Sequence, residues 1–103
     1  MTAKREGSSP AERQLADLEV VFDALAHDSR RHILLVIRYR GGEMTAGEIA
    51  NRFACSWPTT SRHLGVLVRA RLLHVEKRGR ERVYQLQKER LVQVTSRWFK
   101  AFE

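Results

Sequence analysis

Residues Met44 to Leu73, with the sequence MTAGEIANRFACSWPTTSRHLGVLVRARLL, decide the fold of this chain because they encode two short helices in succession. Thr45 and Glu48 have the spacing of a capping box, in which a hydroxyl and a carboxylate satisfy the free amides of a helix start. Ser56 opens the second helix, and Pro58 falls in its first turn, where a missing backbone donor costs nothing. Two helices in this arrangement are typical of a helix-turn-helix.

The second helix is expected to end near Ala70 and to have one apolar and one polar side. At about 100° per residue, one side collects Thr60, Leu64, Leu67 and Val68. The opposite side lacks acidic residues and consists of Thr59, Arg62, Val66 and Arg69, with His63 at its edge. Such a side suits the major groove of DNA, where arginine pairs with guanine and threonine contacts the thymine methyl. Taken alone, it also fits the solvated side of an ordinary amphipathic helix.

After Leu72 the apolar residues alternate along the chain, in the sequence LLHVEKRGRERVYQL. The alternation predicts a hairpin around Gly79, with one strand from Leu73 to about Lys77 and a return strand from Val83 to Leu86. The tip of this hairpin is basic and carries Lys77, Arg78, Arg80 and Arg82. Beside a helix-turn-helix, such a hairpin is typical of a wing whose cations contact DNA phosphates or a minor groove with little base selectivity.

The net charge of +7 is confined to the second part of the chain. Residues 1–61 contain 8 Lys and Arg against 8 Asp and Glu, whereas residues 62–103 contain 11 against 4. The basic excess therefore coincides with the polar helix and the hairpin. This coincidence is the electrostatic pattern expected of a nucleic-acid-binding protein.

The chain is expected to form a single domain at residues 10–103, after a disordered tail at residues 1–9. An apolar content of 43% suffices for one small core, which pairing with a second copy would enlarge. No apolar run approaches the roughly 18 residues of a membrane span, and the N-terminus lacks the apolar centre of a secretion signal. We therefore expect a cytoplasmic protein without a membrane partner, and the one cysteine excludes an internal disulfide.

The first and last helices carry more apolar surface than one small core needs. The first is expected from Pro10, after a capping box formed by Ser9 and Glu12, to about Ala26, and the last from about Glu89 to the end. Pairing of copies across a two-fold axis would cover the surplus. We therefore predict a homodimer with an interface made of Leu15, Leu18, Val21, Phe22, Leu91, Val94, Trp98, Phe99 and Phe102. The alternative is that both helices close the core of the monomer itself.

A central helix is expected between Asp28 or Ser29, as its cap, and the glycine pair at 41–42, because this segment is apolar nearly all round. His27 and His32 lie near its start, where a capping or packing role is expected. His74, on the first strand of the hairpin, is expected to be structural.

Several segments, in this order and at this spacing, resemble those of the ArsR/SmtB-type winged-helix transcriptional repressors of bacteria and archaea. They are ALAHDSRRHIL (24–34), TAGEIA (45–50), the stretch 61–67 that begins SRHL, RLL (71–73) and RGRERVYQL (78–86). The resemblance covers about Val21 to Leu86. It implies a mainly α winged helix-turn-helix with a small β-hairpin, in the order of four helices, two strands and a final helix. It also implies a dimer built from the terminal helices and binding to an inverted repeat in a promoter.

Departures from the pattern of that family bear on metals and on the end of the second helix. Thr45 and Gly47 stand where thiol-sensing members carry Cys-x-Cys, and residues 91–103 have no histidine and only one carboxylate, whereas zinc-sensing members use both there. A closed zinc site needs about four ligands, so we predict no metal at either place and no cofactor, and we assign no inducer.

Arg71 stands where relatives usually have a helix-ending glycine, which predicts a non-glycine residue in or near a left-handed turn.

The DNA-binding hypothesis gives each candidate residue a role. Base reading is assigned to Thr59, Arg62 and His63. Phosphate contacts are assigned to Ser56, Thr60, Arg78, Arg80 and Arg82, with Trp57 and Lys77 on the same surface. No residue arrangement typical of catalysis is present, so an enzyme is not expected.

Two alternative functions remain. A winged helix can instead bind a protein partner or RNA, although an apolar wing tip would then be expected. The chain could also be a redox-sensing repressor that acts through Cys55, which precedes the second helix of the motif. The lack of a second cysteine to resolve an oxidised thiol disfavours this reading.

Overall fold

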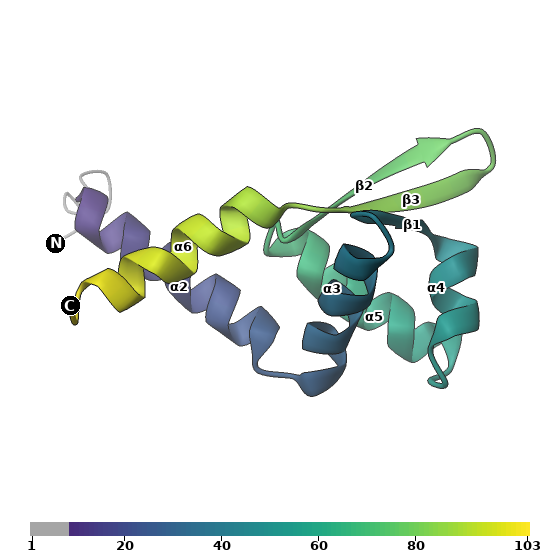
Figure 1. Ribbon diagram of the computed structural model, residues 1–103, viewed down its shortest axis with the longest axis horizontal. Coiled ribbons are helices and arrows are strands. Elements are labelled where there is room, and N and C mark those ends of the chain that lie inside the picture. Colours follow the sequence, from purple (N-terminus) through teal and green to yellow (C-terminus); the bar gives the residue numbers. More distant parts are fainter. Residues whose placement is uncertain (1–8) are drawn as a thin grey trace, which may run out of the picture.

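The computed structural model describes residues 9–103, and the expected tail at residues 1–9 lies outside them apart from Ser9. The elements, labelled as in Figure 1, are α2 (Pro10–Leu25), α3 (Asp28–Tyr39), β1 (Glu43–Thr45), α4 (Ala46–Arg52), α5 (Trp57–Arg69), β2 (Leu73–Arg78), β3 (Glu81–Leu86) and α6 (Lys88–Lys100). The molecule measures 48 × 34 × 23 Å. Helices α2 and α6 form one end, and α4 and the hairpin tip lie toward the other (Figure 1). None of the described helices combines the length and apolarity needed to cross a membrane.

The sheet has three antiparallel strands in the order β1-β3-β2. Strands β2 and β3 form the predicted hairpin, with Leu73 opposite Leu86 and Arg78 opposite Glu81. The third strand, β1, pairs with β3 and was not expected from the sequence. Only Met44 of its three residues is buried, so the strand is too short to show an alternation. The architecture is a winged helix-turn-helix.

Side-chain caps begin α2, α4 and α5, as the sequence predicts, and also α3, whereas α6 has no side-chain cap. In α4, the Glu48 amide donates to Thr45 Oγ1 at 3.1 Å and the Thr45 amide donates to Glu48 Oε1 at 2.9 Å, and α2 has the same box. The expected cap of α3 is corrected by one residue. His27 is its N-cap, and the Ser29 amide donates to His27 Nδ1 at 3.4 Å. A capping role for His27 is thus confirmed.

Helix α5 ends in the left-handed turn that Arg71 predicts, because this residue has φ +61°. The Arg71 amide donates to the Val68 carbonyl at 2.9 Å, and the Leu72 amide donates to the Leu67 carbonyl at 3.0 Å. This pair of bonds is a Schellman motif, which satisfies the last carbonyls of the helix. It directs the chain from α5 straight into β2.

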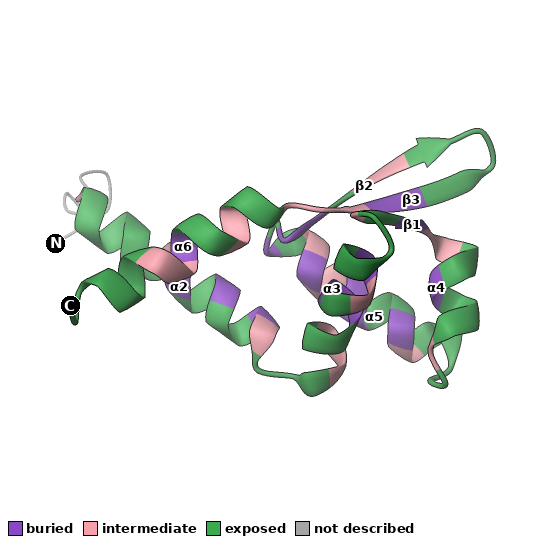
Figure 2. Ribbon diagram, in the orientation of Figure 1, coloured by how far each residue is buried: buried purple, intermediate pink, exposed green. Residues whose placement is uncertain are grey.

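The core lies between α3, α4, α5 and the sheet, and it extends along the inner sides of α2 and α6 (Figure 2). Helix α3 is central, as expected, and buries Ile33, Leu34 and Ile37. The prediction of an interface role is wrong for Leu18, Val21 and Val94, whose side chains are only 8%, 0% and 4% exposed. They are buried in the core of a single chain, where they serve the closure of α2 on α6.

A partly buried ion pair connects the middle of α2 with the start of α6 and the end of α5. The Arg90 guanidinium on α6 donates to both carboxylate oxygens of Asp17 on α2, at 2.7 and 3.0 Å. Its Nε also donates to the carbonyl of Ala70 at 2.9 Å, which caps the end of α5. Arg71 adds a longer contact to Asp17 at 3.6 Å. The pair therefore fixes the terminal helices relative to the second helix of the motif.

Candidate nucleic-acid interface

The outer side of α5 begins at its capping residue. The Ser56 hydroxyl accepts from the Thr59 amide at 3.5 Å and donates to Thr59 Oγ1 at 3.2 Å. Trp57, the first residue of the helix, is 40% exposed, and Arg62 one turn further on is also exposed. No described residue forms an ion pair with the Arg62 guanidinium, so it is available to a ligand.

Two of the predicted DNA contacts are turned into the protein. Thr60 is 2% exposed and His63 is 9% exposed, so the assignments of phosphate contact and base reading to these two residues are wrong. The buried positions of α5 are 60, 63, 64 and 67, which follow the i, i+3, i+4, i+7 spacing of a core-facing stripe. This buried stripe includes His63, which the sequence analysis placed at the edge of the polar side.

His63 belongs to a cluster of nitrogen side chains behind α5. Arg30 Nη1 lies 3.4 Å from His63 Nδ1, and the ring centroids of His27 and His63 are 4.5 Å apart. Burial lowers the pKa of His63, and the electrostatic effect of the neighbouring His27, Arg30 and Arg62 side chains lowers it further. The imidazole is therefore neutral at neutral pH. Because a guanidinium only donates, Nδ1 accepts and the proton of the neutral ring is on Nε2.

One of the four basic residues of the wing forms ion pairs within the described structure, and the other three do not. Arg78 donates to both carboxylate oxygens of Glu43 on β1, at 2.8 and 3.1 Å, and to Glu76 at 2.7 Å. These bonds lower the pKa of Glu43 and raise that of Arg78. The phosphate contact expected of Arg78 stays a prediction. The Arg78 guanidinium links the hairpin to β1 and uses three of its five N–H groups in these bonds.

Lys77, Arg80 and Arg82 are exposed and have no ion pair with any described residue. Lys77 lies directly opposite Arg82 in the register of the hairpin. Like charges in this position disfavour a hairpin, and a polyanion placed against them would relieve the repulsion. The unpaired cations at the wing tip are therefore suited to a phosphate backbone.

The structure also exposes two residues of α5 that the sequence reasoning left out of the site. Ser61 and Arg69 are both exposed, and Arg69 lies over Gly65, where an added Cβ would meet its Nη1 at 3.4 Å. The sequence places Arg69 on the polar side of this helix, but no DNA contact is assigned to it from the sequence. The positions opposite the buried stripe, 58, 62, 65 and 69, were the signal that could have identified it.

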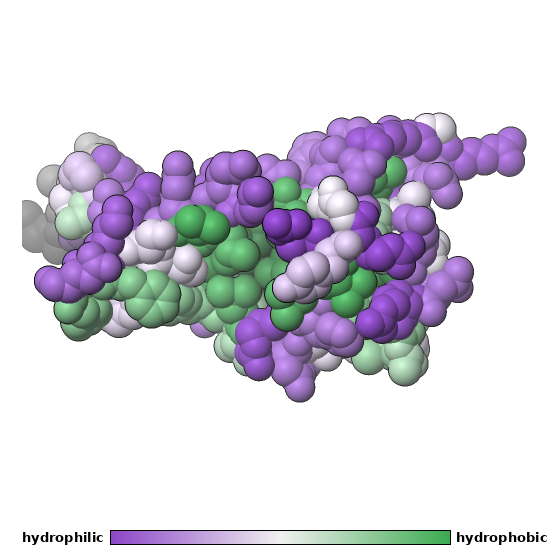
Figure 3. All heavy atoms as spheres, viewed as in Figure 1, coloured by the Kyte–Doolittle hydropathy of each residue, from purple (hydrophilic) through white to green (hydrophobic). Residues whose placement is uncertain are grey.

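The end formed by α2 and α6 has an apolar surface of a different kind. Figure 3 shows hydrophobic atoms gathered over these helices, whereas the wing is hydrophilic. Phe22, Trp98 and Phe102 form a row of edge-to-face rings, with centroid distances of 6.1 and 5.0 Å. We define this row together with Leu15 and Phe99 as the aromatic face. Its residues are 37% to 73% exposed, while Leu91 of the predicted interface is half-buried.

Residues 25–76, about half of the chain, match the family described as "Helix-turn-helix domain". The chain is similar to the transcriptional repressor SdpR of Bacillus subtilis, with 39% identity over 66 residues that cover 64% of this chain and 71% of the repressor. It is also similar to an HTH-type transcriptional regulator of Mycobacterium tuberculosis, with 43% identity over 65 residues that cover 63% and 59% of the two chains.

Solved structures of similar architecture have related descriptions. An ArsR-like transcriptional regulator from Rhodococcus sp. RHA1 superposes with a TM-score of 0.75 at 27% identity, over 84% of this chain and 80% of the other. HlyU from Vibrio cholerae superposes with a TM-score of 0.69 at 27% identity, over 82% and 90%. These likenesses extend beyond the helix-turn-helix to most of the chain.

Proposed function

The chain belongs to the ArsR-type family of winged helix-turn-helix transcriptional regulators, and we propose on this premise that it is a repressor that binds an inverted-repeat promoter site as a homodimer. The observation that carries the proposal is the set of unpaired cations on the outer side of α5 and at the wing tip. They are Arg62, Arg69, Lys77, Arg80 and Arg82. The similarity to the repressor SdpR supports repression.

Each half of the proposed dimer places α5 in a major groove and the wing against the neighbouring backbone. Arg62 and Thr59 are the proposed base-reading residues, because arginine and threonine pair with guanine and with the thymine methyl. Ser56, Arg80 and Arg82 are the proposed phosphate contacts. The two recognition helices of a dimer would then enter major grooves about 34 Å apart on a palindromic site.

The dimer is proposed from the aromatic face, which continues the contact between α2 and α6. Phe99 and Phe102 are 63% and 73% exposed, so they leave large apolar surfaces in contact with water. Removing these surfaces from water would be favourable. A second copy would cover both faces at once, since a two-fold axis pairs a surface with itself. A regulator that acts on chromosomal promoters works in the cytoplasm, which is the location we propose.

Arg62→Ala is expected to weaken binding to the selected operator by about 1 to 3 kcal/mol and to relax its sequence preference. The reason is that a bidentate contact to one base pair is lost while the phosphate contacts remain. The measurement is a duplex titration against the operator and against scrambled DNA. Arg38→Ala, which removes an exposed arginine of α3 far from α5, is the control and should change neither affinity. Equal weakening on both duplexes would contradict base reading by Arg62.

Arg80→Ala is expected to weaken binding to every duplex to a similar extent and to reduce the slope of log K against log salt by about 1. Arg80 lies at the wing tip without a described partner, so its substitution removes a phosphate contact and leaves the fold intact. Arg78→Ala is the comparison variant. It breaks the bonds to Glu43 and should therefore lower the melting temperature, which Arg80→Ala should leave unchanged. A salt slope unchanged in Arg80→Ala would remove the wing tip from the interface.

A further inference from the structure

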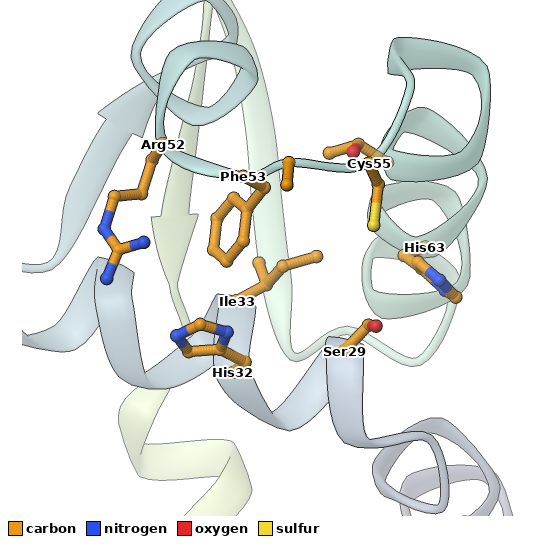
Figure 4. Close-up of a pocket in the computed structure, with 9 residues that line it drawn as sticks. Ser29, His32, Ile33, Arg52, Phe53, Cys55 and His63 are labelled. Carbon is orange, nitrogen blue, oxygen red and sulfur yellow. The ribbon is translucent and has the colours of Figure 1, made fainter.

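A cavity of about 340 Å³ lies behind the helix-turn-helix, between the start of α3, the turn from α4 to α5 and the inner side of α5. Figure 4 shows Ser29, His32 and Ile33 entering from α3, Arg52, Phe53 and Cys55 from α4 and the turn, and His63 from α5. The proposed contacts with DNA use the opposite side of α5, so this cavity has no part in them.

The lining combines an apolar wall with basic and hydroxyl groups. Phe53 and the buried Ile33 supply apolar surface, and His32 meets the Phe53 ring edge-to-face at 5.1 Å. The Arg52 guanidinium lies 5.6 Å from the centroid of the same ring. No carboxylate lines the cavity. The lining is therefore suited to a planar apolar molecule that carries a negative charge.

Thr60 adds a hydroxyl group to the lining of the cavity. This side chain is 2% exposed, lines the cavity and makes no hydrogen bond through its hydroxyl with any described residue. No buried polar side-chain atom of the described residues lacks a partner, so the Thr60 hydroxyl is itself accessible from the cavity and free to donate to a ligand there. His63 also lines the cavity, and its Nε2–H has no described acceptor. A carboxylate could accept from both donors.

We propose that this cavity binds a small aromatic carboxylate. Its volume is at the lower end of the range for small-molecule sites, which favours one or two rings. A metal ion is not proposed, because no three described His, Cys, Asp or Glu side chains are placed to hold one.

A ligand bound in the cavity would contact α5 on its buried side, at Thr60 and His63. Thr60 and His63 are adjacent along α5 to Thr59 and Arg62, so a ligand that draws the former inward shifts the latter relative to the wing. The occupied and empty states therefore present different surfaces to DNA. This second half of the proposal rests on the proposed function, whereas binding to the cavity does not.

Binding is tested without DNA through Cys55, which lines the cavity, is exposed and is the one cysteine of the chain. The rate at which a thiol reagent modifies Cys55 is measured with benzoate or 2-naphthoate at millimolar concentration and constant ionic strength. At least one acid is expected to slow modification about tenfold. 2-Naphthylmethanol, which lacks the charge, and inorganic phosphate, which lacks the rings, are expected to protect weakly. Failure of both acids, or equal protection by either control, overturns the proposal.

Two variants locate the effect within the cavity. Thr60→Val keeps the shape of the side chain and removes its hydroxyl, and Arg52→Gln removes the positive charge. Each is expected to raise the concentration of acid needed for protection about tenfold, and Thr60→Val should fold at least as well as the parent. Arg38→Gln makes the same charge change outside the cavity and should have no effect. Unchanged protection in both cavity variants overturns the proposal.

The coupling is tested by repeating the duplex titration with the protecting acid. A change of about tenfold in affinity for DNA is expected in the parent and not in Thr60→Val. Protection of Cys55 with no change in DNA affinity overturns the coupling. A protein that binds no duplex even without the acid contradicts the proposed function and leaves the result at Cys55 standing.

Discussion

Phe99→Glu is expected to convert the proposed dimer into a monomer and to weaken binding to a duplex with two half-sites by about 100-fold or more. Phe99 lies on α6 and is 63% exposed, so a charge there is well tolerated by the monomer. Across a two-fold axis the same charge is buried near its own copy, which costs several kcal/mol. The large loss on DNA arises because two linked half-site contacts become independent.

The molar mass is measured by sedimentation equilibrium, and affinity is measured on duplexes with one and with two half-sites. The variant should bind one half-site as the parent does, since α5 and the wing are untouched. Tyr39→Glu is the control, because this residue of α3 is 80% exposed and lies outside the aromatic face. A variant that stays dimeric at micromolar concentration would show that another surface holds the copies together.

The sequence was most informative about features that depend on near neighbours, although it misplaced the N-cap of α3 by one residue. The capping boxes at Ser9 and Thr45 involve residues three apart, and both are present. The left-handed turn at Arg71 is also present, and it was expected from the resemblance to the family. Strand β1 escaped prediction because its three residues pair with β3, some 40 positions later in the chain. Nothing in the immediate neighbourhood of Glu43 signals that partner.

The same reasoning explains why the sequence does not distinguish the cations of the wing from one another. The sequence predicts a basic tip, but it cannot distinguish Arg78 from Arg80, which are two residues apart and chemically identical. The distinction comes from Glu43, 35 positions away, which accepts two hydrogen bonds from Arg78. Tertiary pairing decides which cation remains available, and this information is not local.

On the terminal helices the sequence identified apolar residues but could not assign their partners. Leu15 and Leu18 are neighbours in one stripe, yet Leu15 is 55% exposed and Leu18 is 8% exposed. The difference arises from how α6 crosses α2, which depends on the position of Arg90 and the sheet. A hydrophobic stripe predicts that a helix is covered on that side, and it does not say by which chain.

Asp17→Asn is expected to lower the free energy of unfolding by about 1 to 3 kcal/mol at neutral pH. Asp17 and Arg90 have side chains that are 27% and 17% exposed, so their two hydrogen bonds are partly shielded from water. An amide keeps the shape but accepts only on one side, and it leaves the guanidinium without its counter-charge. For a domain of this size the loss corresponds to roughly 4 to 8 °C in melting temperature per kcal/mol. It is measured at one fixed protein concentration, because the proposed dimer would make the melting temperature depend on concentration.

The pH dependence separates this explanation from a general loss of packing. The hydrogen bond from Arg90 lowers the pKa of Asp17 below its ordinary value of 3.8. Its stabilisation is therefore complete above pH 3.8 and is lost as the pH falls through the lower pKa of the folded state. The difference between parent and Asp17→Asn should then shrink on acidification. Glu19→Gln, on the same helix and without an ion pair to a described residue, should have the stability of the parent at both neutral and acidic pH.

Arg90→Lys extends the test to the end of α5. Lysine keeps the charge but cannot donate to both carboxylate oxygens and to the Ala70 carbonyl at once. Its stability is expected between those of the parent and Arg90→Ala. Because the Ala70 carbonyl terminates α5, Arg90→Lys should also increase hydrogen exchange in the last turn of that helix, while Asp17→Asn, which leaves this bond in place, should do so less. Equal exchange in the two variants would mean that Arg90 joins α2 to α6 without positioning α5.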